Sequence, residues 1–223
     1  MTIGMYGAAG ICGVTVPDSK IAREATELLR DASSMLLFQH SLRVYFWGAL
    51  AGNHKNLIYD PELLYVGAMF HDFGLTARYQ SSQLRFEIDG ADAAREFLRG
   101  HGIVEADIDR VWAAIALHTT PGIPHFMQPE IALLHGAAGM DVAGRGYADF
   151  PREEREAVLA AHPREAGFES GMIDEFYEGL KHRPDSTFGT LNDDYLACRD
   201  PHFQRGDICS VMMRSPWVCA HSE

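Results

Sequence analysis

Apolar residues recur at helical spacing along most of this chain, and that periodicity limits the possible folds more than any other feature. No alternating apolar and polar run is long enough to indicate a β-sheet. The sequence therefore predicts an all-α helical bundle, with capping residues and prolines marking where helices begin. The predicted helices start at Pro17-Asp18-Ser19, at Ser33 or Ser34 (running to about Asn53), at Asp60-Pro61 (ending at Gly74), at Asp89-Gly90 (ending at Gly100), at Asp107 (ending near Pro121-Gly122) and at Pro129 (running toward Asp141).

The second half of the chain is more polar than the first. It predicts two amphipathic surface helices, over Pro151–Ala161 and Gly171–Lys181, and irregular structure from Arg183 to Glu223. The chain has 223 residues, 47% of them hydrophobic, which suits one large globular domain. The polar stretch holds too few apolar residues for a core of its own. We expect a single domain with its core at about 34–144 and a C-terminal helical and irregular extension over 145–223.

Acidic residues outnumber basic ones by 31 to 19, giving a formal net charge of -12. Such a surface repels phosphate backbones and anionic lipids, so we expect neither a nucleic-acid nor a membrane partner. The segment Met1–Val16 lacks the Lys or Arg of a secretory signal, and no apolar stretch reaches the ~18–20 residues that span a bilayer. The four cysteines show no CxxC spacing, which favours reduced thiols and a cytoplasmic location. They are Cys12, Cys198, Cys209 and Cys219.

Two histidines and two aspartates stand at widely separated points, each near the middle or the end of a predicted helix. They are His40, the adjacent pair His71 and Asp72, and Asp141. Inward-facing side chains from separate helices of a bundle can build a metal site. Neighbouring residues point about 100° apart on a regular helix, so His71 and Asp72 can converge only where the helix frays, which Gly74 permits.

Two imidazoles and two carboxylates suit one divalent cation, and zinc, iron, manganese, nickel and cobalt all accept such a donor set. A bound cation lowers the pKa of a water ligand from 15.7 toward ~7, so hydroxide becomes available at neutral pH. Two carboxylates buried together without a positive charge would cost several kcal/mol. The pattern therefore predicts a metal-dependent enzyme in which hydroxide attacks a small-molecule substrate.

The set His40, His71-Asp72 and Asp141 resembles the H…HD…D signature of the HD-domain superfamily of metal-dependent hydrolases. The resemblance covers roughly Ser34–Gly144 and implies a bundle of five or more helices. Within the superfamily the chain is similar to the cyanamide hydratase-like branch, which implies a zinc enzyme that adds water to the nitrile of cyanamide, and a homodimer. The short sequence segments that carry this similarity are His40-Ser41-Leu42-Arg43-Val44-Tyr45, Asp60-Pro61-Glu62-Leu63-Leu64-Tyr65, Phe86-Glu87, Leu133-Leu134 and Met140-Asp141-Val142.

Three further residues are candidates for catalysis. His118 follows an apolar helical stripe and is our candidate proton donor, although a histidine at a helix C-terminus is also stabilised by the helix dipole. Glu87 lies near a predicted helix start and is a candidate active-site carboxylate. Arg43 lies three residues after His40, on nearly the same face, where it can pair with an inward carboxylate or an anionic substrate.

The remaining histidines offer weaker signals. His125 can join His118 in a second metal site, whereas solvation is the common state of a loop histidine. We interpret His135 as a packing or surface residue, and the others as surface residues in loops or termini. These are His54, His101, His162, His182, His202 and His221.

The sequence leaves three alternatives open. One is an HD phosphohydrolase acting on a nucleotide or another phosphate ester, although few cationic residues lie near the ligand segments to stabilise the charge of phosphoryl transfer. Another is a non-catalytic HD module that senses a ligand. The third is a dinuclear oxygenase, which requires both His118 and His125 as ligands.

Overall fold

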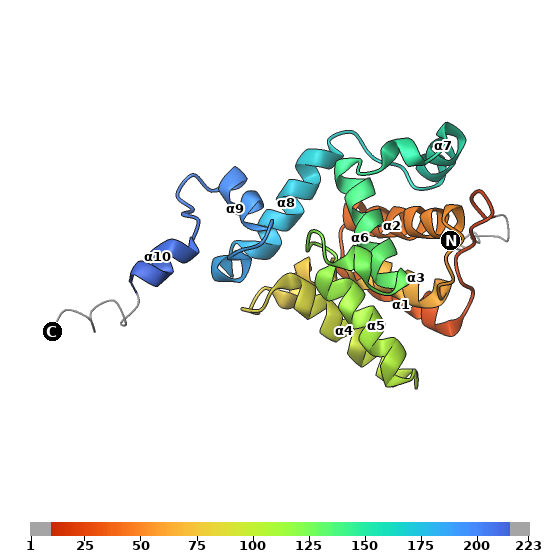
Figure 1. Cartoon of the computed structure of the whole chain (residues 1–223), viewed down its shortest axis with the longest axis horizontal. Helices are drawn as coiled ribbons and strands as arrows, with labels where there is room; N and C mark the ends of the chain where they lie inside the picture. Colours follow the sequence, from red (N-terminus) through yellow and green to blue (C-terminus); the bar gives the residue numbers. More distant parts are fainter. Residues whose placement is uncertain (1–9, 215–223) are drawn as a thin grey trace.

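The computed structural model describes residues 10–214, and in this range the chain is almost entirely helical (Figure 1). The all-α prediction is confirmed: the described residues form ten α-helices and no named strand, with one isolated bridge between Ile11 and Val14. The α-helices are α1 (Lys20–Ala32), α2 (Met35–His54), α3 (Pro61–Phe70), α4 (Phe86–Gly100), α5 (Glu105–Leu117), α6 (Pro129–Ala143), α7 (Arg152–Ala161), α8 (Phe168–Leu180), α9 (Asp193–Arg199) and α10 (Ile208–Met213). Five 3₁₀ turns connect them: η1 (Phe73–Leu75), η2 (Ala77–Tyr79), η3 (Pro124–Phe126), η4 (Tyr147–Asp149) and η5 (Pro184–Thr187).

Helix α2 is the central element of the bundle. It packs against α3 and α6, while α4 and α5 lie side by side and α5 also contacts α6 (Figure 1). Most of α2 is buried, which agrees with its dense apolar sequence. Its first turn is capped by Ser34, whose hydroxyl accepts a hydrogen bond from the backbone N–H of Leu37. These contacts hold α2 in one orientation against the helices that carry the other candidate ligands.

The predicted caps fit the structure where a side chain satisfies the first turn. Ser19 caps α1, Asp60 caps α3 with Pro61 at its first position, and Pro129 begins α6. Helix α6 ends at Gly144, which has a φ of 67°, in the left-handed region that favours glycine. The starts of these helices were therefore predictable from local chemistry.

Three predicted helix boundaries were wrong. Helix α4 begins at Phe86 and not at Asp89-Gly90, because Phe86 is fully buried and the Asp89 carboxylate accepts hydrogen bonds from Ser82 and Arg183 instead of capping. Helix α5 begins at Glu105, so Asp107 lies inside its first turn. The helix dipole stabilises a carboxylate at that position as well. Helix α3 ends at Phe70, and Gly74 lies within η1.

The expectation of irregular structure after Arg183 was also wrong, because η5, α9 and α10 form there. Helix α9 lies beside α8, and α10 extends from it away from the bundle (Figure 1). Cys219 and His221 lie outside the described residues, as does most of the segment Met1–Val16. Helices α8 and α9 pack on α2, η1 and α4 through a second apolar cluster, made of Leu37, Leu75, Phe86, Phe168, Met172, Phe176, Leu180 and Leu196.

A buried arginine fastens this C-terminal part to the bundle. Arg183 is 1% exposed, and its guanidinium donates to the backbone oxygens of Gly74 (2.6 Å) and Leu84 (2.9 Å) and to the carboxylate of Asp89. A buried guanidinium requires such a complete set of acceptors. The segment after α8 therefore stabilises the loop that follows α3 through the hydrogen bonds of Arg183.

Within residues 10–214, none of the helices is both long and apolar enough to cross a membrane.

We predict that Gly74→Ala destabilises the protein. A Cβ at this position would collide with the backbone carbonyl of Phe86, which cannot move away as a flexible side chain can. We expect a loss of about 2–3 kcal/mol in the free energy of unfolding, measured by urea denaturation. The matched control is Gly136→Ala in α6, where a Cβ meets nothing and alanine favours the helix. Equal stabilities of the two variants would contradict this account.

His162 was interpreted as a surface residue, and that interpretation was wrong. Its side chain is buried, and its ring stacks on Phe46 with centroids 5.2 Å apart. Burial, aided by the positive charge of Arg43, lowers the pKa of His162 to about 4. Of the members of this group that the structure describes, His101 and His182 are half-buried, and His54 and His202 are exposed.

The lowered pKa of His162 predicts a pH dependence of stability. Between pH 6.5 and about 4 the unfolded chain binds a proton at His162 that the folded chain does not, so stability falls as the pH falls. In His162→Phe, which keeps a ring against Phe46, we expect a flatter dependence of the urea midpoint in this window. His202→Phe should behave as wild type, and an identical slope in the wild type and His162→Phe would contradict the assignment.

Candidate metal centre

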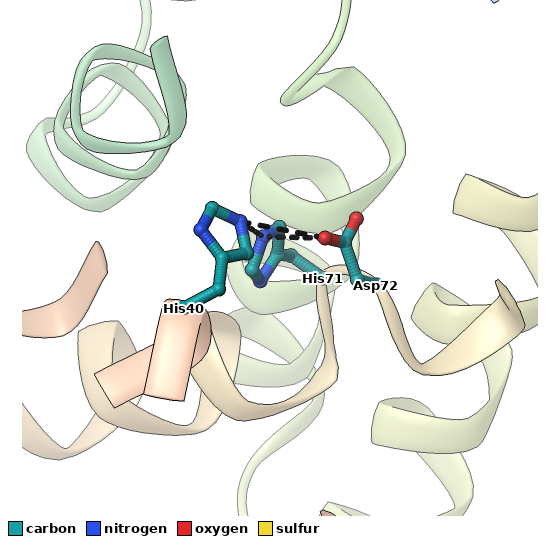
Figure 2. Close-up of side chains that lie close together, drawn as sticks. All are labelled: His40, His71 and Asp72. Atoms are coloured by element: carbon teal, nitrogen blue, oxygen red, sulfur yellow. Dashed lines mark hydrogen bonds and ion pairs between the residues drawn. The ribbon is translucent and has the colours of Figure 1, made fainter. Parts of the chain in front are cut away.

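Three of the four predicted ligands meet at one buried point (Figure 2). His40 comes from α2, and His71 ends α3 with helical backbone angles. The backbone of Asp72 leaves the helix, with φ −103° and ψ 7°, so its side chain turns toward its neighbour's ring. Gly90 lets α4 approach closely, since a Cβ there would lie 2.6 Å from the backbone oxygen of Phe70. The fraying that the sequence predicted at this helix end is what brings the adjacent pair together.

The donor atoms of these residues are close enough to share one ion. The Nε2 atoms of His40 and His71 are 3.0 Å apart, and Asp72 Oδ2 lies 3.4 Å from the first and 3.2 Å from the second. Tetrahedral zinc with bonds of 2.0–2.2 Å separates its donors by about 3.3–3.6 Å. The three side chains are each 1% exposed. Their spacing therefore fits a divalent cation with little adjustment.

Hydrogen bonds on the far side of each ring fix which nitrogen is free. His71 Nδ1 donates to the backbone oxygen of Ala68 (2.8 Å), and His40 Nδ1 donates to Asp141 Oδ2 (2.7 Å). When both rings are neutral, each has a lone pair on Nε2, and the two Nε2 atoms face each other and a carboxylate. Metal-binding histidines are usually held in this way.

The electrostatics of the cluster also favour a cation. Burial lowers the pKa of His71, so its ring is a neutral donor. Burial opposes a charge on Asp72, but the adjacent His71 and the other rings hold its pKa well below the usual range. Both Asp72 oxygens are buried and neither has a hydrogen-bond partner. An ionised carboxylate without partners in the interior is strongly unfavourable, and a metal ion at this point would supply the missing charge.

Asp141, the fourth predicted ligand, contacts the back of His40 and lies outside the group of close donor atoms. Its carboxylate also accepts two hydrogen bonds from Arg43, at 2.8 and 2.9 Å, and one from Trp47 Nε1 at 2.9 Å. Burial opposes its charge, but contacts with His40 and Arg43 lower the pKa of Asp141. In this arrangement Asp141 orients His40, and its role as a ligand stays a prediction.

Arg43 is fully buried and pairs with an inward carboxylate, which is one of the two alternatives that the sequence left open. Its remaining donor contacts the backbone oxygen of Pro163 at 2.8 Å. The guanidinium therefore supports Asp141. Trp47 was missed by the sequence reasoning, yet it lies four residues after Arg43 on one helix face, and that spacing could have revealed it.

His118 lies beside the cluster, at the end of α5. Its Nδ1 donates to the backbone oxygen of Ile115 (2.7 Å), and its Nε2 lies 3.5 Å from Asp72 Oδ1, the oxygen that faces away from His40 and His71. Its ring also meets that of His71 edge-on, with centroids 4.9 Å apart. His118 is thus held with a free Nε2 next to the metal ligands, as a catalytic acid or base requires.

Glu87 is fully buried in the first turn of α4. Its Oε1 accepts hydrogen bonds from Arg85 (2.7 Å), Thr119 (2.5 Å) and Asn192 (2.9 Å). Burial raises the pKa of Glu87, but Arg85 and the nearby His118 outweigh it, so the net shift is downward and the group stays charged. Asn192 was not predicted, since it lies in the segment that the sequence described as irregular.

The structure does not group His125 with His118. The ring of His125 packs edge-on against His135, with centroids 5.0 Å apart, and His135 Nδ1 donates to the backbone oxygen of His118 (2.7 Å). In the part of the chain that the structure describes, the cluster of His40, His71 and Asp72 is the one set of close metal-ligating donors. His135 is buried, as the packing interpretation requires.

We predict that the purified protein binds about one divalent cation and that Asp72→Ala weakens this binding by more than about 100-fold. Changes to residues that only orient the ligands already lose about 10–100-fold in affinity. Elemental analysis after dialysis and competition with a chelator measure both. Removal of the ion should also lower the melting temperature, since only the folded chain holds the site. The control is His125→Ala, which should bind as wild type does; undiminished affinity in Asp72→Ala would contradict the site.

Comparison with known proteins agrees with this geometry. The family model described as HD domain matches residues 37–162, which is more than half of the chain and includes all four predicted ligands. A search of curated proteins found no match. On the strength of the matched segment and of the histidine–aspartate cluster within it, this chain belongs to the HD domain family.

Proposed function

We propose that the protein is a metal-dependent hydratase or hydrolase for a small, uncharged substrate, with a nitrile such as cyanamide as the first candidate. HD domains are generally metal-dependent hydrolases, and the His40, His71 and Asp72 cluster supplies a donor set for one divalent ion. Zinc is the favoured metal, and the other first-row ions accept the same donors.

The observation that carries the choice of substrate is the pairing of every buried arginine around the site. Arg43 pairs with Asp141 and Arg183 with Asp89, while Arg85 pairs with Glu87 from a partly exposed position. Phosphoryl transfer requires cations that face the transferred group. Because these guanidiniums already contact carboxylates, they supply little net charge to a phosphate, and a neutral substrate suits the site better.

The protein's own residues would divide the work as follows. His40, His71 and Asp72 would hold the ion, and a divalent ion there supplies Lewis acidity that activates water and polarises the substrate. His118, whose Nδ1 is fixed by Ile115, would accept a proton from the attacking water at Nε2. It would then give that proton to the nitrile nitrogen, so that water adds across the triple bond to give an imidic acid. The imidic acid becomes the amide when its hydroxyl proton moves to the nitrogen.

We also propose that the partner of the protein is a small-molecule substrate and not a nucleic acid or a membrane, that the chain forms a homodimer, and that it works in the cytoplasm. The single-domain organisation is part of the same proposal.

The test compares two chemistries on one metal-loaded preparation. We expect urea to form from cyanamide and no phosphate to be released from a panel of nucleotides. His118→Ala should lower kcat/KM for cyanamide by about 100-fold or more while keeping its metal, since general acid–base groups contribute 10²–10⁴-fold. His125→Ala is the control, expected to keep full activity. Phosphate release without nitrile hydration would overturn the proposal in favour of a phosphohydrolase.

A further inference from the structure

A residue outside the family segment contacts Glu87, a buried carboxylate near the metal centre. Asn192 lies in the C-terminal extension, 2% exposed, and its Nδ2 donates to Glu87 Oε1 at 2.9 Å. The segment that matches the HD domain ends at residue 162. The extension therefore touches a buried carboxylate of the candidate site directly.

The backbone of Asn192, just before α9, is helical, with φ −74° and ψ −19°. A side chain that caps a helix usually leaves an extended backbone, and the side chain of Asn192 makes no capping hydrogen bond. Its amide is directed to Glu87. The long-range contact with Glu87 is therefore the interaction that this buried side chain makes.

A short chain of contacts connects Asn192 with His118. Glu87 Oε1 accepts from both Asn192 and Thr119, and Thr119 directly follows His118. The third donor to that oxygen, Arg85, has a side chain that is 34% exposed, so Asn192 and Thr119 are the interior contacts. The carboxylate of Glu87 thus joins the start of α9 to the turn that carries His118.

Aromatic packing gives the same connection a second, independent support. Tyr195 of α9 stacks on Phe176 with centroids 4.2 Å apart and ring planes 11° from parallel. Phe176 meets Phe86 edge-on at 5.5 Å, and Phe86 meets His118 edge-on at 5.6 Å. Helix α9 therefore lies against the ring system that positions the histidine.

We propose that Asn192 is a positioning residue of the metal site, holding Glu87 so that Glu87 and Thr119 keep His118 next to Asp72. The C-terminal extension then helps to position residues of the active site, in addition to packing on the helical bundle. A neutral amide suits this role, because it stabilises the carboxylate without adding an opposing ion. The test by kcat/KM for cyanamide rests on the proposed function, whereas a second test, by azide binding, does not.

The first experiment is a double-mutant cycle on the metal-loaded, full-length protein. Asn192→Ala should lower kcat/KM for cyanamide by about 10- to 100-fold, as small misplacements of catalytic groups do, with metal content unchanged. In a Glu87→Ala background the same substitution should have no further effect, because Asn192 acts through Glu87. Asn192→Asp, which sets two carboxylates against each other, should be at least as impaired as Asn192→Ala.

Thr190→Val is the matched control for the local fold. The Thr190 hydroxyl accepts from the backbone N–H of Asn192 (3.1 Å) and donates to the backbone oxygen of Thr187 (2.7 Å), so the variant perturbs the same turn without touching Glu87. It should match Asn192→Ala in melting temperature but keep wild-type kcat/KM. Equal losses of activity in the two variants, or additive effects in the cycle, would overturn the proposal.

The second readout is the affinity of azide for the cobalt(II)-loaded protein, followed in the visible spectrum. Asn192→Ala and Glu87→Ala should each shift the azide Kd by threefold or more, and the double variant should match Glu87→Ala. If the wild type hydrates no nitrile but this pattern holds, the proposed substrate fails and the role of Asn192 stands. If Asn192→Ala leaves the azide Kd unchanged while Glu87→Ala shifts it, the role of Asn192 fails.

Discussion

A charged carboxylate, Asp72, is enclosed with the Nε2 atoms of two histidine rings, and neither of its oxygens has a hydrogen-bond partner. Such a point in a protein interior is unfavourable unless a cation occupies it. The other features of the centre follow from this requirement. Helix α3 must end at Phe70 so that Asp72 can turn inward, and α2 must present His40 opposite it.

The charges around the centre are balanced within the protein. Asp141 pairs with Arg43 and also accepts a hydrogen bond from Trp47, while Glu87 pairs with Arg85 and Asp89 with Arg183. These pairs hold the ligands and their neighbours in place while adding little net charge toward a bound molecule. The pairs of Arg43 and Arg183 are buried, which strengthens their hydrogen bonds and fixes the groups around the ligands.

The sequence predicts the parts of this structure that depend on local chemistry. Ser34, Asp60-Pro61 and Pro129 mark helix starts through caps and backbone preferences, and these predictions hold. Contacts between distant segments were not predictable. Asp89 resembles a helix start because its pairing with Arg183 arises only in the fold, and Asn192 gives no signal in a segment with little periodicity. His162 shows the same limit, since its burial depends on packing against Phe46.

The guanidinium of Arg183 has a consequence for how the chain matures. It is the partner of the Gly74 carbonyl, in the loop that follows the adjacent ligand pair, and of Asp89 in the next helix. During synthesis these groups leave the ribosome about a hundred residues before Arg183 does, and at 5–20 residues per second that interval lasts roughly 5–20 s. The nascent bundle therefore passes through a stage in which its ligand loop has not yet received its final support.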